Sequence, residues 1–439
     1  MSQATASCAP CALCPIRSAE NWHIALRTDT MSSVAKTVDL PHIARVLARL
    51  EPDPRIVISG NAATPQTLVE LIDETLEAAT LNVLNALVAM PRREGIRLET
   101  AFVGPGMRGS PTLRYIPCRL SMLPLLFAGE YRPDVVVVHT TTPRKGAVSL
   151  GVEVNVLPAA MEAARARGGI VIAAANPHMP FTHGDGVVDL TDIDYLVEID
   201  EPIVTVAASD PDERSLRIGD QISDHIQNGS SLQLGIGGVP DAVLLAATNL
   251  RGLRIWSETI SDGVLSLENA GALDPRMPVR TSFMLGSNDL YAWVADNPRL
   301  TMIRTERCND PGLIEKNYGM TSVNGALEVD LWGQVNASRR NGQIFSGIGG
   351  STDFITGAMH APHGKAFIAL PSWHPKAQVS TVVSQLSGPS TSAQPSAIVT
   401  EQGIAWLFGA DEHQQAENLI SHAAHPNAQA ALRESLAKR

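Results

Sequence analysis

Glu258 is the residue of this chain whose surroundings most favour covalent chemistry. It follows a short apolar run that includes Ile255 and Trp256, and the turn-forming sequence Ser-Asp-Gly begins three residues after it. A carboxylate at the end of a strand, facing a turn, is well placed for reaction and poorly placed for packing. Because carboxylates can act as covalent nucleophiles, we interpret Glu258 as a candidate nucleophile. A purely structural acid at a strand end is the alternative.

Two copies of the sequence Gly-Ile-Gly-Gly flank Glu258, at residues 235–238 and at residues 347–350. The first copy follows a predicted strand and opens a predicted helix, where glycine permits close approach of a ligand and the helix N-terminus favours an anion. It is not a dinucleotide fingerprint, because Pro240 stands where G-x-G-x-x-G requires a third glycine. Backbone N–H groups of two such loops could form an oxyanion hole, although such turns also serve as purely structural devices.

Glu328 and Asp330 are a second pair of acidic candidates. They alternate with Leu327, Val329 and Leu331, so the pattern predicts both acids on the polar face of a strand. Paired carboxylates could perform acid–base catalysis. A half-exposed strand with a polar face explains the same pattern equally well.

Length and composition indicate a globular protein with more than one domain. The chain has 439 residues, of which 44% are hydrophobic and 18% charged, and its formal net charge is −11. This length exceeds that of one ordinary core. The acidic balance argues against nucleic-acid binding, and the lack of a long apolar run argues against a transmembrane helix.

The cysteines predict a reducing, cytoplasmic setting. They are Cys8, Cys11, Cys14, Cys118 and Cys308. An odd number without framework spacing does not suggest disulfides. The C-x-x-C-x-x-C run invites a metal-site interpretation, but no fourth ligand is evident nearby. We therefore expect no metal site, and we interpret residues 1–35 as a disordered N-terminal extension without the features of a signal peptide.

Strand and helix patterns alternate from about residue 40 to the end of the chain. The predicted strands are residues 55–60, 134–139, 169–174, 195–199, 231–234, 281–285, 366–370 and 397–400. The predicted helices are residues 43–50, 64–78, 157–167, 218–227 and 240–248. This alternation is typical of βαβ units with a largely parallel sheet. A polar, proline-containing segment at residues 207–215 predicts a boundary between domains at 36–210 and 211–439.

Dispersed motifs of the chain, in the same order, resemble those of the acetyl-CoA hydrolase/transferase family. The segments that carry the resemblance are residues 57–60, 176–184, 232–243, 256–267, 283–297, 324–336, 347–357 and 398–407. The family includes the class I CoA-transferases for 4-hydroxybutyrate, acetate, butyrate and succinate. The resemblance implies two related open α/β domains with the active site at their interface.

The resemblance also implies a ping-pong mechanism on Glu258. In this family the glutamate attacks an acyl-CoA thioester to give an acyl-glutamyl anhydride and then a glutamyl-CoA thioester, from which an acceptor carboxylate takes the CoA. Dividing one difficult exchange into easier steps is the logic of covalent catalysis. An acyl-CoA hydrolase on the same scaffold is the alternative, and a non-catalytic CoA-binding protein is a third hypothesis.

Further roles are implied residue by residue. The predicted catalytic residues are Glu258, Gly237, Gly350, Asn309 and Glu401. The predicted CoA-binding residues are Gly235, Ile236, Gly237, Gly238, Val239, Gly350 and Lys376. In these roles Asn309 contacts the substrate carboxylate, Gly350 contacts the acyl group through its amide, and Lys376 contacts the CoA phosphates.

The expected partners are small molecules. The resemblance implies an acyl-CoA and a short-chain carboxylate as substrates, with coenzyme A as a substrate rather than a tightly bound cofactor. A homodimer is the family expectation, and the composition and cysteines argue for a cytoplasmic protein that binds neither nucleic acid nor membrane.

Overall fold

The structure, a computed structural model, describes residues 34–207, 210–390 and 392–438. We call residues 34–207 the first half and residues 210–438 the second half. Most of the predicted N-terminal extension, with its three cysteines, lies outside the described residues. No helix in the described ranges is long and apolar enough to cross a membrane.

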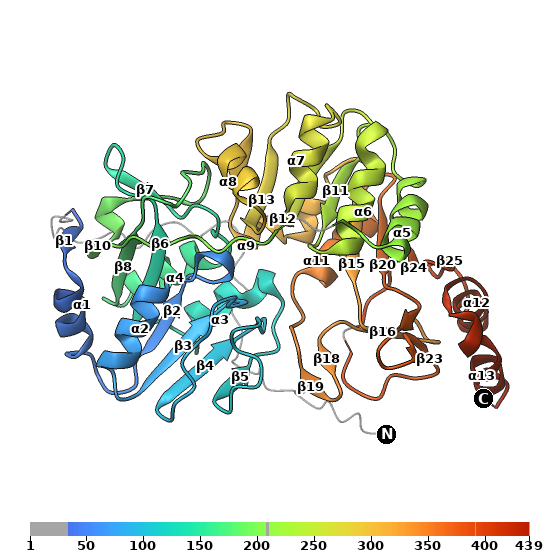
Figure 1. Cartoon of the computed structure of the whole chain (residues 1–439), viewed down its shortest axis with the longest axis horizontal. Helices are drawn as coiled ribbons and strands as arrows, with labels where there is room; N and C mark the ends of the chain where they lie inside the picture. The colour runs from blue at the N-terminus through green and yellow to red at the C-terminus, as the bar shows by residue number, and fades with distance from the viewer. Residues whose placement is uncertain (1–33, 208–209, 391, 439) are drawn as a thin grey trace, which may run out of the picture. The chain divides into compact units, whose positions relative to one another are not determined.

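The first half forms a wholly parallel sheet of eight strands (Figure 1). In spatial order the strands are β1 (Lys36–Val38), β10 (Tyr195–Glu198), β8 (Ile170–Ala175), β6 (Val135–Thr140), β2 (Arg55–Ile58), β3 (Ala79–Val83), β4 (Ile96–Thr100) and β5 (Leu113–Tyr115). The helices are α1 (Leu40–Leu47), α2 (Gln66–Thr75), α3 (Leu123–Ala128) and α4 (Leu157–Arg165). Strand β6 is buried along its whole length, as expected for a central parallel strand covered on both faces.

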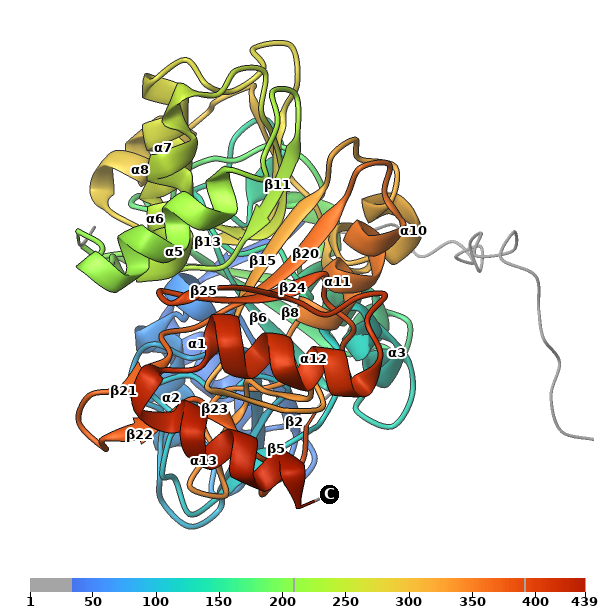
Figure 2. The same ribbon diagram turned by 90° about the vertical axis from the view of Figure 1, so that its right-hand side faces the viewer.

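The second half repeats this architecture with one antiparallel edge strand, β25. The strands in spatial order are β14 (Leu300–Met302), β13 (Val279–Met284), β12 (Arg254–Ile260), β11 (Ser231–Leu234), β15 (Thr321–Gly325), β20 (Lys365–Ala369), β24 (Ala397–Thr400) and β25 (Gly403–Trp406). The helices are α5 (Glu213–Ser223), α6 (Gly238–Ala246), α7 (Asp262–Asn269), α8 (Asn288–Val294), α9 (Thr305–Cys308), α10 (Pro311–Ile314), α11 (Ser351–His360), α12 (Glu412–Asn418) and α13 (Pro426–Ala437). Helices α12 and α13 follow β25 and end the chain (Figure 2).

Short strands extend from the two sheets. The pairs are β7 (Ala147–Ser149) with β9 (Val187–Asp189), β18 (Arg339–Arg340) with β19 (Gln343–Ile344), and β21 (Trp373–His374) with β22 (Val379–Ser380). Strands β16 (Glu328–Asp330), β17 (Val335–Asn336) and β23 (Val382–Val383) form a small sheet.

The predicted strands agree with the structure where the sequence is continuously apolar. Strands β6, β8, β11 and β24 lie within one residue of their predicted bounds. The helix predicted over residues 64–78 is too long, because α2 ends at Thr75 and β3 begins at Ala79. Strand β3 was not predicted, because Thr80 and Asn82, although buried, interrupt its apolar pattern.

Hydrogen bonds give Glu328 and Asp330 structural roles, which favours the structural interpretation over an acid–base pair. Asp330 is only 3% exposed, and its carboxylate accepts hydrogen bonds from the backbone N–H groups of Trp332 and Gln334. Glu328 accepts a hydrogen bond from the Asn336 side chain. The alternation predicted a polar face in solvent, but the turn after β16 turns Asp330 inward to satisfy backbone donors.

Candidate active site

Glu258, Asn309 and Gly350 meet at one point. Glu258 lies on β12, and its Oε2 accepts a hydrogen bond of 2.5 Å from Asn309 Nδ2. A Cβ atom added to Gly350 would lie 2.0 Å from Glu258 Oε2 and 2.1 Å from Asn309 Nδ2. Only glycine therefore fits at position 350 without displacing the carboxylate or the amide.

The end of helix α9 fixes the position of Asn309. The Asn309 N–H donates to Thr305 O at 2.9 Å, which makes Asn309 the C-terminal cap of the helix. The indole N–H of Trp256 donates to Cys308 O at 2.8 Å, and Cys308 Sγ donates to Ser257 O at 3.4 Å. Helix α9 is thus attached to β12 at the residues just before Glu258, which holds the Asn309 amide against the carboxylate.

The second glycine loop is held by the first half. Phe102 pairs with Gly347 in an isolated antiparallel bridge, and Leu120 N–H donates to Gly349 O at 3.2 Å. The Tyr115 hydroxyl accepts a hydrogen bond of 3.2 Å from the Ile348 N–H. The loop that places Gly350 beside Glu258 is therefore positioned by strands and loops of the first sheet.

A cavity of about 250 Å³ opens in front of Glu258. The first half contributes Asn85 and Phe102 to its wall, and the second half contributes Glu258 and residues of both glycine loops. None of the described residues that line this cavity is a lysine or an arginine. The cavity is therefore a small, largely apolar space with one carboxylate.

Burial raises the pKa of Glu258 from its ordinary value of 4.5 to about 7. The hydrogen bond from Asn309 lowers the pKa, and the charge of Asp353 raises it further. Asp353 lies on α11 and is itself buried, with a partner in Arg119 at 3.5 Å. Burial disfavours the charged carboxylate, which costs folding stability near neutral pH, and such groups are therefore typical of functional sites.

Glu258→Gln is expected to stabilise the protein more at pH 8 than at pH 5. The pKa of Glu258 is about 7 in the folded protein, above its ordinary value of 4.5. The folded state thus binds this proton more tightly than the unfolded state, so the free energy of unfolding falls as the pH rises from 4.5 to about 7. Glutamine removes that loss. Thermal unfolding of both proteins at the two pH values measures the effect, and an equal difference at both would contradict it.

The first glycine loop connects two cavities. Gly235 lines the Glu258 cavity, Gly237 lines a second cavity of about 430 Å³, and the exposed side chain of Ile236 lines both. Gly237 has a φ of +114°, a backbone conformation that favours glycine. Gly238 and Val239 begin helix α6, and neither of them lines either cavity.

Glu401 and Lys376 lie apart from this arrangement. Glu401 accepts hydrogen bonds from the N–H and the hydroxyl of Ser372, at 2.8 and 2.7 Å. Burial acts to raise its pKa, but the hydrogen bonds from Ser372 outweigh burial, so the pKa of Glu401 lies below its ordinary value. Lys376 lies in the exposed turn between β21 and β22. Neither residue lines the Glu258 cavity.

Several residues of the site were missed by sequence analysis. They line the cavity and include Asn85, Phe102, Gln233, Phe283 and Asn324. Asn85 has a φ of +51°, in a loop directly after β3. If β3 had been predicted, Asn85 would have stood out as a polar residue just after the carboxyl end of a strand.

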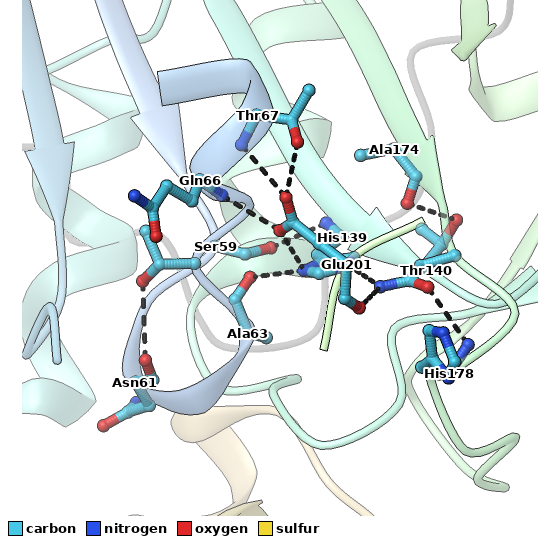
Figure 3. Close-up of polar contacts among 12 residues, drawn as sticks. Ser59, Asn61, Ala63, Gln66, Thr67, His139, Thr140, Ala174, His178 and Glu201 are labelled. Atoms are coloured by element: carbon cyan, nitrogen blue, oxygen red, sulfur yellow. Dashed lines mark hydrogen bonds and ion pairs between the residues drawn. The ribbon is translucent and has the colours of Figure 1, made fainter. Parts of the chain in front are cut away.

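A cluster of polar side chains lies between the carboxyl end of β6 and the start of α2 in the first half (Figure 3). His139, at the carboxyl end of β6, lies within 3.1 Å of Ala63 O through Nδ1 and within 2.9 Å of Asn176 Nδ2 through Nε2. Burial lowers the pKa of His139 to about 4, so the imidazole is neutral. Glu201 accepts hydrogen bonds from Gln66 and Thr67 at the start of α2. These groups satisfy one another, which makes the cluster a structural support.

No group of three or more His, Cys, Asp or Glu side chains in the described ranges is arranged to hold a metal ion. Cys118 and Cys308 are free thiols. The thiol of Cys308 is buried beside Glu258, and burial and the charge of Glu258 raise its pKa well above the ordinary value. Cys308 is thus a neutral packing residue that also anchors α9.

Comparison with known proteins shows similarity over most of the chain. Residues 44–208 match the acetyl-CoA hydrolase/transferase N-terminal domain, and residues 286–436 match the C-terminal domain of the same family. The chain is 33% identical to a 4-hydroxybutyrate coenzyme A transferase of Clostridium kluyveri over 418 residues, which cover 90% of this chain and 96% of that protein.

Solved structures show the same fold. A 4-hydroxybutyrate CoA-transferase of Porphyromonas gingivalis is 30% identical, with a TM-score of 0.75 over 92% of this chain and 97% of that one. RipA of Yersinia pestis has the same coverage and a TM-score of 0.84 at 22% identity, which supports the fold alone. The α/β fold class predicted from the sequence is confirmed by these similarities. The chain belongs to the acetyl-CoA hydrolase/transferase family, whose motifs its sequence resembles.

Proposed function

We propose that this protein is a CoA-transferase that moves CoA from a short-chain acyl-CoA to a carboxylic acid through covalent intermediates on Glu258. The observation that carries the proposal is the contact of Glu258 with Asn309 and Gly350 at a small cavity lined by both halves of the chain. We further propose that the two halves correspond to domains at residues 36–210 and 211–439. The expectations of a cytoplasmic homodimer without a tightly bound cofactor stay predictions.

The proposed reaction begins with attack by the Glu258 carboxylate on the thioester carbonyl. A C–O bond forms, the C–S bond breaks, and CoA leaves as the thiolate. The thiolate then attacks the glutamyl carbonyl of the resulting anhydride, which releases the acyl group as a carboxylate and leaves a glutamyl-CoA thioester. An acceptor carboxylate reverses these steps and restores Glu258. The anhydride and the thioester are about equally reactive acyl derivatives, so no step is steeply uphill. The reaction consumes no net proton.

Asn309 and the backbone N–H groups of the glycine loops can stabilise the negative charge that develops in these steps. Negative charge develops on the carbonyl oxygen of the attacked group, where preorganised donors in a site shielded from water are most effective. The Asn309 amide already donates to Glu258 Oε2, so it can stay with that oxygen as the carboxylate becomes an anhydride or thioester. Because Gly350 has no side chain, its backbone lies close to Glu258 Oε2, where its amide can reach an acyl group bound to the carboxylate.

The second cavity is where we place the CoA tail. It is larger than the Glu258 cavity, and Ile236 lines both, so a thioester in the small cavity could continue into the larger one. Binding there would supply energy remote from the reacting atoms, which can be used to orient the thioester. Contact of Lys376 with CoA phosphates, and a catalytic role of Glu401, remain predictions.

Exchange is expected to increase with pH through a midpoint near pH 7. The attacking form of Glu258 is the carboxylate, and the pKa of this residue is about 7. Below that pH the neutral acid cannot attack, so kcat/KM should fall about tenfold for each pH unit well below the midpoint. Initial rates of exchange from pH 5 to pH 8 measure this, and a rate independent of pH over that range would contradict it.

The proposed function is tested by initial-rate kinetics with a short-chain acyl-CoA and a carboxylate acceptor such as acetate. A ping-pong mechanism predicts parallel double-reciprocal plots when both substrates are varied. Intersecting plots would contradict covalent intermediates. Continuous release of free CoA without an acceptor would identify an acyl-CoA hydrolase instead.

A further inference from the structure

Glu153 is a second buried acid next to the Glu258 cavity. It lies in the segment after β7 and is 1% exposed. Its Oε2 accepts a hydrogen bond of 2.6 Å from Asn61 Nδ2. Its Oε1 is buried without a hydrogen-bond partner among the described groups. A charged carboxylate is costly to bury with so few hydrogen-bond donors around it, so burial favours the neutral acid.

Two amides connect Glu153 with the cavity. Asn61 Oδ1 accepts a hydrogen bond of 2.7 Å from Asn85 Nδ2, and Asn85 lines the cavity in front of Glu258. Asn61 and Asn85 have φ values of +47° and +51°, a region that costs energy for a residue with a side chain. Strained backbone at two linked asparagines indicates that the placement of their amides matters.

The backbone also brings Glu153 close to the catalytic strand. Glu153 forms an isolated antiparallel bridge with Phe283 of β13, and Phe283 is the β13 partner of Thr259, the residue after Glu258. Burial raises the pKa of Glu153 to about 8, the side-chain amides of Asn61 and Asn155 oppose this, and the charge of Glu258 raises it further.

The groups that face Glu153 are otherwise uncharged. They are the amide of Asn61, the amide of Asn155 and the backbone of Phe283. The titratable group that faces it is Glu258. Two carboxyl groups that share a buried site do not both ionise readily, because each charge destabilises the other.

We propose that Glu153 is a positioning residue that acts as a neutral acid. It holds Asn61, and through Asn61 it holds the amide of Asn85 at the cavity wall. Because Glu153 stays neutral, Glu258 carries the single negative charge of the pair. This inference rests on the proposed function. Because Asn61 engages Asn85 Nδ2, the chain fixes which side of the Asn85 amide a substrate meets. Ionisation of Glu153 would place a second negative charge near Glu258. That charge would repel the acceptor carboxylate as it approaches the glutamyl-CoA thioester.

The test is the pH profile of kcat/KM for exchange between an acyl-CoA and acetate, corrected for spontaneous thioester hydrolysis. The wild type should lose activity above pH 8, to about one tenth of its maximum at pH 9. Glu153→Gln keeps an acceptor for Asn61 and cannot ionise. It should retain wild-type kcat/KM within about twofold at pH 7 and exceed the wild type about tenfold at pH 9.

Glu153→Leu tests the positioning role, since leucine offers no acceptor to Asn61. It should lower kcat/KM on the order of tenfold at pH 7, the effect of one lost hydrogen bond. Glu99→Gln is the matched control, because Glu99 is a buried acid of the first half whose partner is Arg55 and which does not line the cavity. It should keep the alkaline loss of the wild type even if it lowers the unfolding temperature.

The outcomes separate the inference from the proposed function. A Glu153→Gln variant with the same alkaline loss as the wild type overturns the role of the neutral acid. A folded Glu153→Leu variant with wild-type kcat/KM overturns the positioning role. If the wild type exchanges CoA at no pH with any acyl-CoA and short-chain acid, the proposed function itself fails.

Discussion

Glu258→Ala is expected to lower kcat/KM for CoA exchange by at least about 10⁴-fold while the protein stays folded. Removal of a covalent nucleophile leaves only binding and the oxyanion donors, and in other enzymes such losses are of this size or larger. The fold should tolerate the change, because burial already disfavours the charged form of Glu258. Exchange of labelled CoA between an acyl-CoA and a carboxylate measures the activity.

Glu328→Ala is the matched control for this loss. Glu328 is an acid of the same half that bonds to Asn336 and does not line the cavity. Its removal should leave kcat/KM within about threefold of the wild type. If Glu258→Ala kept a tenth or more of the wild-type activity, Glu258 would not be the nucleophile.

Gly350→Ala should reduce kcat/KM by at least about a hundredfold. A methyl group there would lie 2.0 Å from Glu258 Oε2 and 2.1 Å from Asn309 Nδ2, far inside the contact distance. One of these groups must move, and displacement of a catalytic group by about 1 Å is enough for such a loss. Steady-state kinetics should show the effect mainly in kcat, because the larger cavity is lined by other residues.

Gly388→Ala separates this steric effect from a general effect of replacing glycine. No atom lies within 4 Å of a Cβ added at Gly388, and its backbone φ lies outside the left-handed region. That variant should have wild-type kinetics. A Gly350→Ala variant as active as Gly388→Ala would show that the close approach of Gly350 to Glu258 is not needed.

The fold could be predicted from the sequence to the extent that buried strands are apolar. Strands β6 and β8 are runs of small and branched apolar residues and were located within a residue. Strands β3 and β4 were missed because buried polar side chains interrupt them, among them Asn82 and Glu99. A period-based analysis cannot tell a buried polar residue from an exposed one, since the partner that makes burial tolerable lies elsewhere in the chain.

The same limit applies to the site. Glu258, Asn309 and Gly350 were all named from local motifs, and the structure brings them into contact. Their geometry depends on the attachment of α9 to β12, through Trp256 and Cys308, across 52 residues of sequence. This attachment has no local signature.

The contribution of the first half to the site could not be predicted. Asn85 and Glu153 come from loops far from Glu258 in sequence. Asn85 lines the cavity, and Glu153 is held near it by its bridge with Phe283. Neither residue belongs to a motif that chemistry would single out in isolation. The hydrogen bonds of Asn61 to both residues give them a common role.

The central claim is a covalent bond between Glu258 and the acyl-CoA, and chemical trapping tests it most directly. The protein is incubated with a short-chain acyl-CoA without an acceptor, treated with borohydride or hydroxylamine, digested, and analysed by peptide mass spectrometry, with Glu258→Ala as the control. We predict that modification occurs at Glu258 in the wild type and is absent from the variant. An unmodified Glu258 in protein that is active in CoA exchange, or an adduct on another residue, would contradict the account.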